Sequence, residues 1–372
     1  MHLIKIVIAA FIIAVSGQVK AASDVAYLKK DCTAYDPSTC FTTSADLTSW
    51  LKGARKPNAN SPIHVQIGVG VFDNLRLRCD SSFTGYVSVR GAGRFSTIFF
   101  ADNGYAVSAV NCTNVEFSDL TIRNVVASGG AISWSGGGES RWNNVEVDAV
   151  YYGWLEQSCG SIRGKHYWTG SRIMTAQFGS DTAYSAQCDE SWIQGSEVTA
   201  KTSATLPGTS SPVVAVAASG GGEVHVYGSV IRVLIEKATA GLVAAATAEN
   251  GGQIHIHGTG IDVISSVGKN ITALYAATNG AIHANETAYN MRTGTGGTVT
   301  RILNQGGHIQ APYFWGQYPT PQHPSLPNII SETGADTATI TSGTLDGRPH
   351  LVVYDSTCSS SRWYDTNDKV CR

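Results

Sequence analysis

The chain has 372 residues, of which 40 are glycine and 15% are charged, and its formal net charge is −2. Little charge with abundant glycine is typical of short strands joined by tight turns. The weak net charge argues against a general nucleic-acid binder, which needs a basic surface.

Residues 1–21 have the pattern of a secretory signal peptide. Lys5 precedes an apolar run from Ile6 to Val15, and small residues lead to an expected cleavage after Ala21. This run is too short to span a bilayer, and no later stretch reaches the roughly 18 apolar residues of a membrane helix. We therefore predict a secreted or cell-surface protein, extracellular or periplasmic, without a membrane span.

Residues 22–61 are predicted to form an N-terminal cap that contains a short helix. A helix over residues 45–52 places Leu47, Trp50 and Leu51 on one face, with Ser44 or Asp46 near its N-cap. Such a helix would cover the open strand edge at the end of a stack of strands, which otherwise invites aggregation.

One sequence unit recurs in the second half of the chain. Copies begin at Gly221, Gly251, Asn279 and Gly306, at spacings of 30, 28 and 27 residues, and a period in this range indicates a solenoid. Each copy alternates apolar and polar residues, as a half-buried strand does. Three such strands per unit, separated by glycines, predict a three-sided coil. Residues 62–318 are thus expected to form an all-β, right-handed parallel β-helix of about ten coils.

The opening of this region carries a resemblance to known proteins. From His64 to Phe100, a strand ending in Gly-x-Gly-x-Phe is followed by Val87-Ser-Val-Arg-Gly-Ala-Gly and then by Thr97-Ile. This order resembles the first coils of the pectin-lyase-like superfamily, which includes pectate lyases, pectin methylesterases, polygalacturonases and phage tailspikes.

The resemblance is to the fold and extends over the later coils. It implies that the protein recognises an extended, usually acidic polysaccharide along an exposed parallel sheet and cleaves it by β-elimination or by acid/base hydrolysis. The chain has neither the Trp-Ile-Asp-His segment of pectate lyases nor the Asn-Thr-Asp, Asp-Asp and Arg-Ile-Lys set of polygalacturonases. Catalytic residues must therefore be sought in the local chemistry of this chain.

The cysteines predict a disulfide framework. An even number in an exported protein favours four disulfides, and Cys-x-x-Cys spacing for metal ligation is lacking. Pairing between neighbours in sequence gives Cys32 with Cys40, Cys79 with Cys112, Cys159 with Cys188, and Cys358 with Cys371. The last pair would close a small C-terminal module, residues 319–372, which is a cap, a hairpin or an oligomerisation element; the oligomeric state is not predicted.

Aromatic and basic residues gather between residues 134 and 192. Aromatic rings stack on sugars, and arginine binds carboxylates with two parallel hydrogen bonds. The candidate substrate-binding residues are Arg141, Trp142, Tyr152, Trp154 and Trp168. The alternative is that the rings fill wide coils.

A cluster of titratable donors in the same window suits a lyase. Arg163 and Arg172 would neutralise a uronate carboxylate, and Lys165 would remove the C5 proton if its pKa is lowered by burial and nearby positive charge. His166 or Tyr167 would act as the acid. A solvated basic face is the alternative reading.

Two further groups suggest other chemistry. Glu146 and Asp148 are expected on one face of a strand. They could act as acid and base in hydrolysis, in which Asp148 is a catalytic candidate, or they could bind calcium. No cofactor is required. The column of His225, His255 and His283 should stack at about 4.8 Å between coils and suits a transition metal. We favour a solvent-facing polar ladder, because a carboxylate is not expected beside it.

Two functions follow from these patterns. The first is a secreted carbohydrate-active enzyme on an extended, acidic polysaccharide, with β-elimination favoured over hydrolysis. The alternative is a non-catalytic glycan-binding adhesin or surface structural protein that uses the β-helix as a rigid rod. The partner in either case is a polysaccharide.

Overall fold

The computed structural model describes residues 24–52, 62–79, 85–125, 129–158, 163–176, 181–202, 212–237 and 241–311, together with the backbone of short strands between residues 314 and 371. The predicted signal peptide and most of the C-terminal module lie outside these residues.

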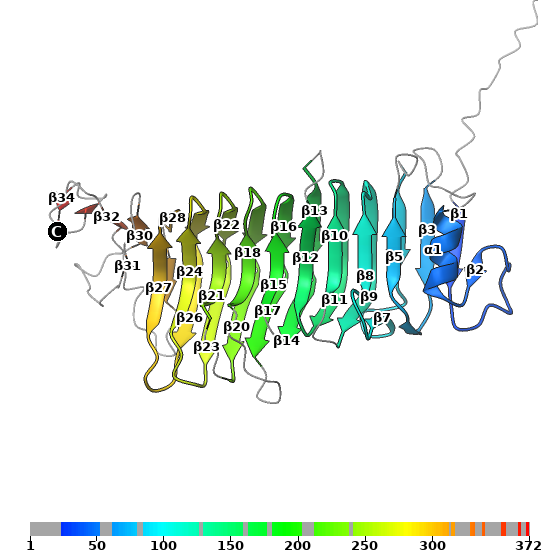
Figure 1. Cartoon of the computed structure of the whole chain (residues 1–372), viewed down its shortest axis with the longest axis horizontal. Coiled ribbons are helices and arrows are strands. Elements are labelled where there is room, and N and C mark those ends of the chain that lie inside the picture. Colours follow the sequence, from blue (N-terminus) through cyan, green and yellow to red (C-terminus); the bar gives the residue numbers. More distant parts are fainter. Residues whose placement is uncertain are drawn as a thin grey trace, which may run out of the picture.

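The described chain is a parallel β-solenoid with one helix near its N-terminal end (Figure 1). Its strands belong to a sheet of 24 strands and a sheet of 10 strands. From β1 (Asp24–Leu28) to β29 (Phe314–Gly316), the strand pairs are parallel. The predicted β-helix, the fold implied by the likeness to the pectin-lyase-like superfamily, is confirmed.

Each coil contributes strands to three sides. Side 1 consists of β1, β3 (Ile63–Ile67), β6 (Val87–Arg90), the first parts of β9 (Asn114–Asn124) and β11 (Glu139–Ala149), β13 (Lys165–Thr169), β16 (Glu190–Gln194), β19 (Glu223–Tyr227), β22 (Gln253–His257), β25 (Ala281–Asn285) and β28 (His308–Gln310). Side 2 consists of β4 (Gly70–Phe72), β7 (Thr97–Ala101), the second parts of β9 and β11, β14 (Arg172–Ala176), β17 (Glu197–Thr202), β20 (Val230–Ile235), β23 (Gly260–Ser265), β26 (Thr287–Arg292) and β29.

Side 3 is the 10-stranded sheet. Its parallel strands are β5 (Leu75–Arg78), β8 (Val107–Val110), β10 (Gly130–Ser135), β12 (Tyr152–Ser158), β15 (Asp181–Ala186), β18 (Val213–Ala218), β21 (Val243–Ala248), β24 (Ile271–Ala277) and β27 (Val299–Gln305). The remaining strands are β2 (Cys40–Phe41), β30 (Asn328–Ser331), β31 (Thr337–Ala338), β32 (Leu351–Tyr354), β33 (Tyr364–Asp365) and β34 (Val370–Cys371). Antiparallel pairs join β31 to β27 and β30 to β28.

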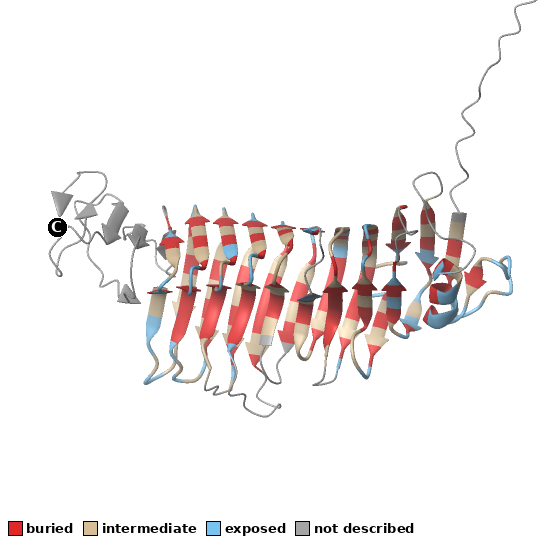
Figure 2. Ribbon diagram, turned by 45° about the horizontal axis from the view of Figure 1, so that its top comes forward, coloured by how far each residue is buried: buried red, intermediate tan, exposed pale blue. Residues whose placement is uncertain are grey.

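The repeat places equivalent residues in register from coil to coil. On side 1, Val224 pairs with Ile254, and Ile254 pairs with Ile282. All three side chains are fully buried, whereas the alternate residues face outward, as the bands of colour in Figure 2 show. Burial in alternate positions therefore supplies a continuous apolar core along the whole rod.

A repeated pair of residues makes the corner between sides 1 and 2. The first residue has a positive φ in Gly170, Gly195, Gly228, Gly258 and Glu286. The second is the hydroxyl residue Ser171, Ser196, Ser229, Thr259 or Thr287, whose side chain donates to the carbonyl oxygen two residues earlier. Glycine adopts this φ without the steric cost of a Cβ atom. The hydroxyl adds a second hydrogen bond to a carbonyl oxygen that, in Gln194, Tyr227, His257 and Asn285, also accepts the N–H of the corner glycine on the preceding coil.

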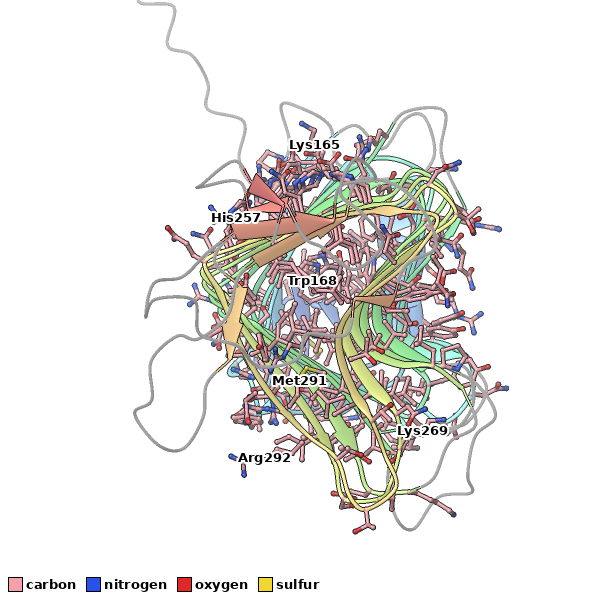
Figure 3. All side chains as sticks on the ribbon, turned by 90° about the vertical axis from the view of Figure 1, so that its left-hand side faces the viewer. Lys165, Trp168, His257, Lys269, Met291 and Arg292 are labelled. Carbon is pink, nitrogen blue, oxygen red and sulfur yellow. A yellow bond between two sulfur atoms is a disulfide. The ribbon has the colours of Figure 1, made fainter. Side chains whose placement is uncertain are left out.

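Wide coils in the middle of the rod are filled by aromatic rings. Trp142, Trp154 and Trp168 are fully buried, and Figure 3 shows Trp168 in the interior of the solenoid. Trp142 stacks on Phe117 with ring centroids 4.2 Å apart and on Trp168 at 4.8 Å. The prediction that these three tryptophans bind substrate is wrong, because their strand phase turns them inward and no sugar reaches them.

The predicted N-terminal cap contains helix α1 (Ser44–Lys52). Leu47 and Leu51 are buried, and the partly buried Trp50 packs on Phe41 with ring centroids 5.6 Å apart. The expected apolar face is confirmed.

The N-cap residue is Thr43, directly before Ser44 and three residues before Asp46, which were predicted to lie near the N-cap. Thr43 Oγ1 accepts the backbone N–H of Asp46 at 3.1 Å and donates to the carboxylate of Asp46 at 2.6 Å, which is a reciprocal cap. Ser44 instead donates to the carbonyl oxygen of Asp73 at 2.9 Å, and so ties the helix to the first coil.

Two predicted disulfides are confirmed. Cys32 bonds to Cys40, and Cys79 bonds to Cys112. Cys188 is also disulfide-bonded. Its predicted partner Cys159 and the predicted pair's Cys358 lie outside the described residues, and of Cys371 only the backbone is described.

Candidate functional site

Five stacked, half-buried rings form an outward-facing column on side 1. This ring ladder consists of Tyr167, Trp192, His225, His255 and His283, one residue from each of β13, β16, β19, β22 and β25. Successive ring centroids are 4.7, 5.3, 4.7 and 5.0 Å apart, and successive ring planes differ by 7–11°. The in-register coils hold these rings at the spacing of the strands.

The faces of the inner rings of the ladder are not open to a ligand. Each inner ring has both faces covered by its neighbours, and the Arg141 guanidinium lies 5.9 Å from the ring centroid of Tyr167 at one end. At the other end, His283 Nδ1 lies 3.0 Å from Gln310 Oε1. Nε2 of His225 and of His255 are themselves buried, so a ligand meets the edges of these rings and not their faces.

Two carboxylates lie beside the imidazoles. Glu223 Oε1 is 3.0 Å from His225 Nε2 and 3.2 Å from His255 Nε2, and Glu190 Oε1 is 3.3 Å from His225 Nε2. We call Glu190, Glu223, His225 and His255 the His–Glu cluster. The expectation that the histidine column lacks a neighbouring carboxylate is wrong. The residues two positions after the histidines, such as Tyr227 and Asn285, are indeed not acidic. Glu223, however, lies two residues before His225 on the same face of the strand.

Burial and like charge disfavour a proton on the central imidazole. Burial lowers the pKa of His255 to about 4, and repulsion from His225 and His283 acts in the same direction, against attraction by Glu223. His255 is therefore neutral at neutral pH and offers a ring-nitrogen lone pair.

A second outward column flanks the ladder. Tyr227 and His257 follow the histidines on β19 and β22, and their rings stack at 5.2 Å. Tyr227 Oη lies 3.4 Å from His225 Nδ1. Figure 3 shows His257 and Lys165 on the outside of the solenoid.

The predicted cations of side 1 are joined to carboxylates of the same side. Arg163 NH2 lies 3.0 Å from Glu223 Oε2, and Arg141 forms an ion pair with Glu139. Lys165 is exposed, with its Nζ 5.6 Å from the ring centroid of Trp192. Side 1 therefore mixes both signs of charge.

The predicted acid His166 is buried within the coil. Its Nδ1 lies 2.8 Å from Ser140 Oγ and its Nε2 lies 3.0 Å from Asp189 Oδ2, and all three side chains are buried. The order resembles a Ser-His-Asp triad, but Ser140 Oγ already accepts the indole N–H of Trp142 at 2.7 Å. The prediction that His166 protonates a substrate is wrong, because the strand phase places it among the tryptophans.

A buried carboxylate supports this interior network. Glu156 accepts the backbone N–H groups of Gln187, Cys188 and Asp189 at 2.9–3.2 Å. Burial raises the pKa of Glu156, and the nearby Asp189 raises it further, while the three N–H donors oppose the shift. The network orders the turn before β16, and the sequence offered no sign of it apart from the acidic pair at residues 189–190.

Arg172 and the two candidate calcium ligands lie on side 2. Arg172 is 3.5 Å from Glu146 and 3.3 Å from Glu197, and Glu146 also forms an ion pair with Arg94. Asp148 forms a separate ion pair, in which its Oδ2 lies 3.1 Å from Nε of Arg123. Calcium binding at Glu146 and Asp148 stays a prediction, and it would have to displace these arginines.

The proposed catalytic set is therefore not one site. Arg163 and Lys165 belong to side 1, His166 to the interior, and Arg172 and Asp148 to side 2.

The fifth substrate-binding candidate, Tyr152, lies on β12 of side 3, where it packs edge-on against Tyr151. Of the five binding candidates, Arg141 alone lies on side 1 as an exposed residue. Tyr167 and Trp192 point outward on this side because they alternate with the inward residues.

The fold and this surface define a parallel β-helix whose side 1 carries an outward-facing ladder of half-buried rings. Among solved structures, the chain is similar to a pectin methylesterase from carrot, with 12% identity, a TM-score of 0.44, and coverage of 79% of this chain and 88% of that chain. It is also similar to a pectin methylesterase from Yersinia enterocolitica, with 13% identity, a TM-score of 0.38, and coverage of 68% and 80%.

Comparison with protein-family models gives no match, and comparison with curated protein sequences gives none either. Among the described residues, no helix has the length and apolar character to cross a membrane.

Proposed function

We propose that the chain is a secreted, non-catalytic polysaccharide-binding protein whose ligand lies along the ring ladder of side 1. The observation that carries this proposal is the in-register stack of Tyr167, Trp192, His225, His255 and His283. Their edges repeat at about 4.8 Å, a spacing of the order of one sugar unit. A straight polymer with repeated hydroxyl groups matches such a row.

Binding is favoured over cleavage by the positions of the candidate catalytic groups. A lyase needs a base, an acid and a neutralising cation around one reacting carbon, but His166 is enclosed and Arg172 is on another side. Lys165 shares the outward face of β13 with Tyr167, the alternative acid, but the predicted cation Arg163 is paired with Glu223.

The ion pairs of side 1 favour a neutral or sparsely charged glycan. Arg141 and Arg163 are paired with Glu139 and Glu223, so a uronate carboxylate would have to displace a protein carboxylate to reach them. Neutral hydroxyl groups form hydrogen bonds to the ring edges without breaking an ion pair.

Secretion is supported by the disulfides and by the pattern of residues 1–21. Disulfides persist in oxidising compartments, and the described chain contains the bonds Cys32–Cys40 and Cys79–Cys112.

Affinity electrophoresis against neutral plant and bacterial glycans and against pectate, alginate, glucuronan and hyaluronan tests this proposal. We expect retardation by at least one neutral glycan, weakened by about tenfold in Trp192→Ala, which corresponds to about 1.4 kcal/mol. Phe95→Ala is the matched control, because Phe95 is an exposed aromatic residue outside the ladder, and it should bind as wild type.

Three outcomes would contradict the proposal. They are no retardation by any glycan, equal loss in Phe95→Ala, and release of unsaturated uronate or of reducing ends. The last would show that the protein cleaves its ligand.

A further inference from the structure

We propose that the His–Glu cluster binds one divalent transition-metal ion, with Glu223, His225 and His255 as ligands. The ligands come from two neighbouring coils, on β19 and β22. An ion held there would join these coils across side 1. The proposal does not depend on polysaccharide binding.

The ligand atoms are close to the separations that a metal requires. Zinc binds imidazole nitrogen and carboxylate oxygen at about 2.0–2.2 Å in tetrahedral geometry, so two of its ligand atoms lie about 3.3 Å apart. The oxygen of Glu223 is 3.0 and 3.2 Å from the Nε2 atoms of His225 and His255. The three ligand atoms lie within 4.8 Å of one another, and a small inclination of the two rings brings the nitrogens together.

The imidazole nitrogens that face this point lack a hydrogen-bond partner. Nε2 of His225 and Nε2 of His255 are buried, and within the described parts of the chain neither makes a hydrogen bond. Glutamate oxygens lie within 3.3 Å of them, but not in line with a ring N–H. Buried polar groups without partners are costly, and an ion between the nitrogens and the oxygen would satisfy all three.

Surrounding residues hold the ligands in orientation. Arg163 NH2 binds Glu223 Oε2 at 3.0 Å, which leaves Oε1 directed at the imidazoles. Tyr227 Oη is 3.4 Å from His225 Nδ1, so it can accept the Nδ1–H of an imidazole whose Nε2 binds metal. Such outer hydrogen bonds fix the tautomer and typically change metal affinity 10- to 100-fold.

The chemistry of the ligands selects the class of metal. Imidazole nitrogen with carboxylate oxygen suits zinc, copper or nickel, whereas calcium and magnesium prefer oxygen ligands alone. Zinc is therefore the probe, and calcium serves as the ionic control.

Titration calorimetry of the full-length protein with zinc chloride, after removal of metal with EDTA, tests the site. We expect one zinc ion per chain, no heat from calcium, and a higher melting temperature with zinc, because a ligand that binds the folded state stabilises it. His255→Asn and Glu223→Gln should weaken zinc binding at least about 100-fold, and Tyr227→Phe about tenfold. His283→Asn is the matched control, because His283 belongs to the same ladder and lies outside the His–Glu cluster.

Circular dichroism and melting of each metal-free variant establish that it is folded. Cobalt in place of zinc adds a direct readout, since a low-coordinate site with nitrogen and oxygen ligands gives visible absorption that His255→Asn should abolish. The proposal is overturned by the absence of zinc heat and of a melting shift, or by wild-type zinc affinity in folded His255→Asn. It is also overturned by equal loss of affinity in His283→Asn.

Discussion

The carboxylate of Glu223 lies 3.2 Å from the imidazole of His255 on the next coil of the solenoid. This contact joins a polar residue at the start of one strand to the middle of the neighbouring strand. It arises because residues two apart share a face and successive coils stack in register.

The lowered pKa of His255 predicts a pH-dependent stability of the metal-free protein. The folded state disfavours the proton, so between pH about 4 and about 6.5 the unfolded state binds more protons at this residue. The free energy of unfolding should therefore rise with pH through this range and show no further gain from His255 above it. Urea unfolding in EDTA at both ends of the range measures the rise, which should be smaller in His255→Asn. An identical rise in the variant would refute the assignment.

Buried Trp168 and outward-facing Trp192 should respond in opposite ways to substitution. Trp168→Phe leaves a cavity beside Trp142 and Tyr184 and should cost about 1–3 kcal/mol of stability with unchanged affinity for polysaccharide. Trp192→Ala should weaken binding with a smaller effect on unfolding. Thermal melting and affinity electrophoresis of both variants test the assignment. Loss of glycan affinity in a folded Trp168→Phe protein would contradict it.

Removal of the Glu156 carboxylate should destabilise the middle of the rod. Glu156→Ala leaves the N–H groups of Gln187, Cys188 and Asp189 without their acceptor and should cost about 2–4 kcal/mol. Glu236→Ala removes an exposed carboxylate and should change stability by less than about 0.5 kcal/mol. Chemical unfolding of both variants measures the difference, and equal effects would show that Glu156 is not a structural acceptor.

The positive φ at the corner of sides 1 and 2 predicts an unequal response of two glycines. A Cβ atom at Gly228 or at Gly260 meets no atom within 4 Å, but only Gly228 has a positive φ, of +52°. Gly228→Ala should therefore cost about 1 kcal/mol, whereas Gly260→Ala should be neutral or stabilise by about 0.5 kcal/mol. Melting temperatures compare the two variants. A Gly228→Ala protein as stable as wild type would contradict the role of this corner.

Local sequence patterns determined the coil and its inward and outward residues. Val224 and Val226 alternate with His225, and the same alternation returns in the next copies. In-register stacking then dictates that equivalent residues meet, so the histidine column was predictable. The Cys79–Cys112 bond followed similarly from proximity in sequence.

The same alternation could have distinguished the inward-facing from the outward-facing aromatic residues of the middle coils. Trp168 shares the inward phase of His166, and Tyr167 has the opposite phase, but residue type alone grouped the tryptophans as a binding surface. The corner pairs such as Gly228-Ser229 were also visible in the sequence. Their meaning depended on the φ angle and hydrogen bond that the structure shows.

Tertiary structure alone decided which charged groups meet. The coils between residues 139 and 194 lack the regular spacing of the later repeat, so the chain order of Arg163, Lys165 and Arg172 did not show that a corner at Gly170 divides them between two sides. The contact between Glu223 and His255 likewise depends on the register of two strands 30 residues apart in the repeat. Hydrophobic periodicity specifies which face of a strand is buried, whereas contacts between coils depend on loop length and register, which only the folded chain sets.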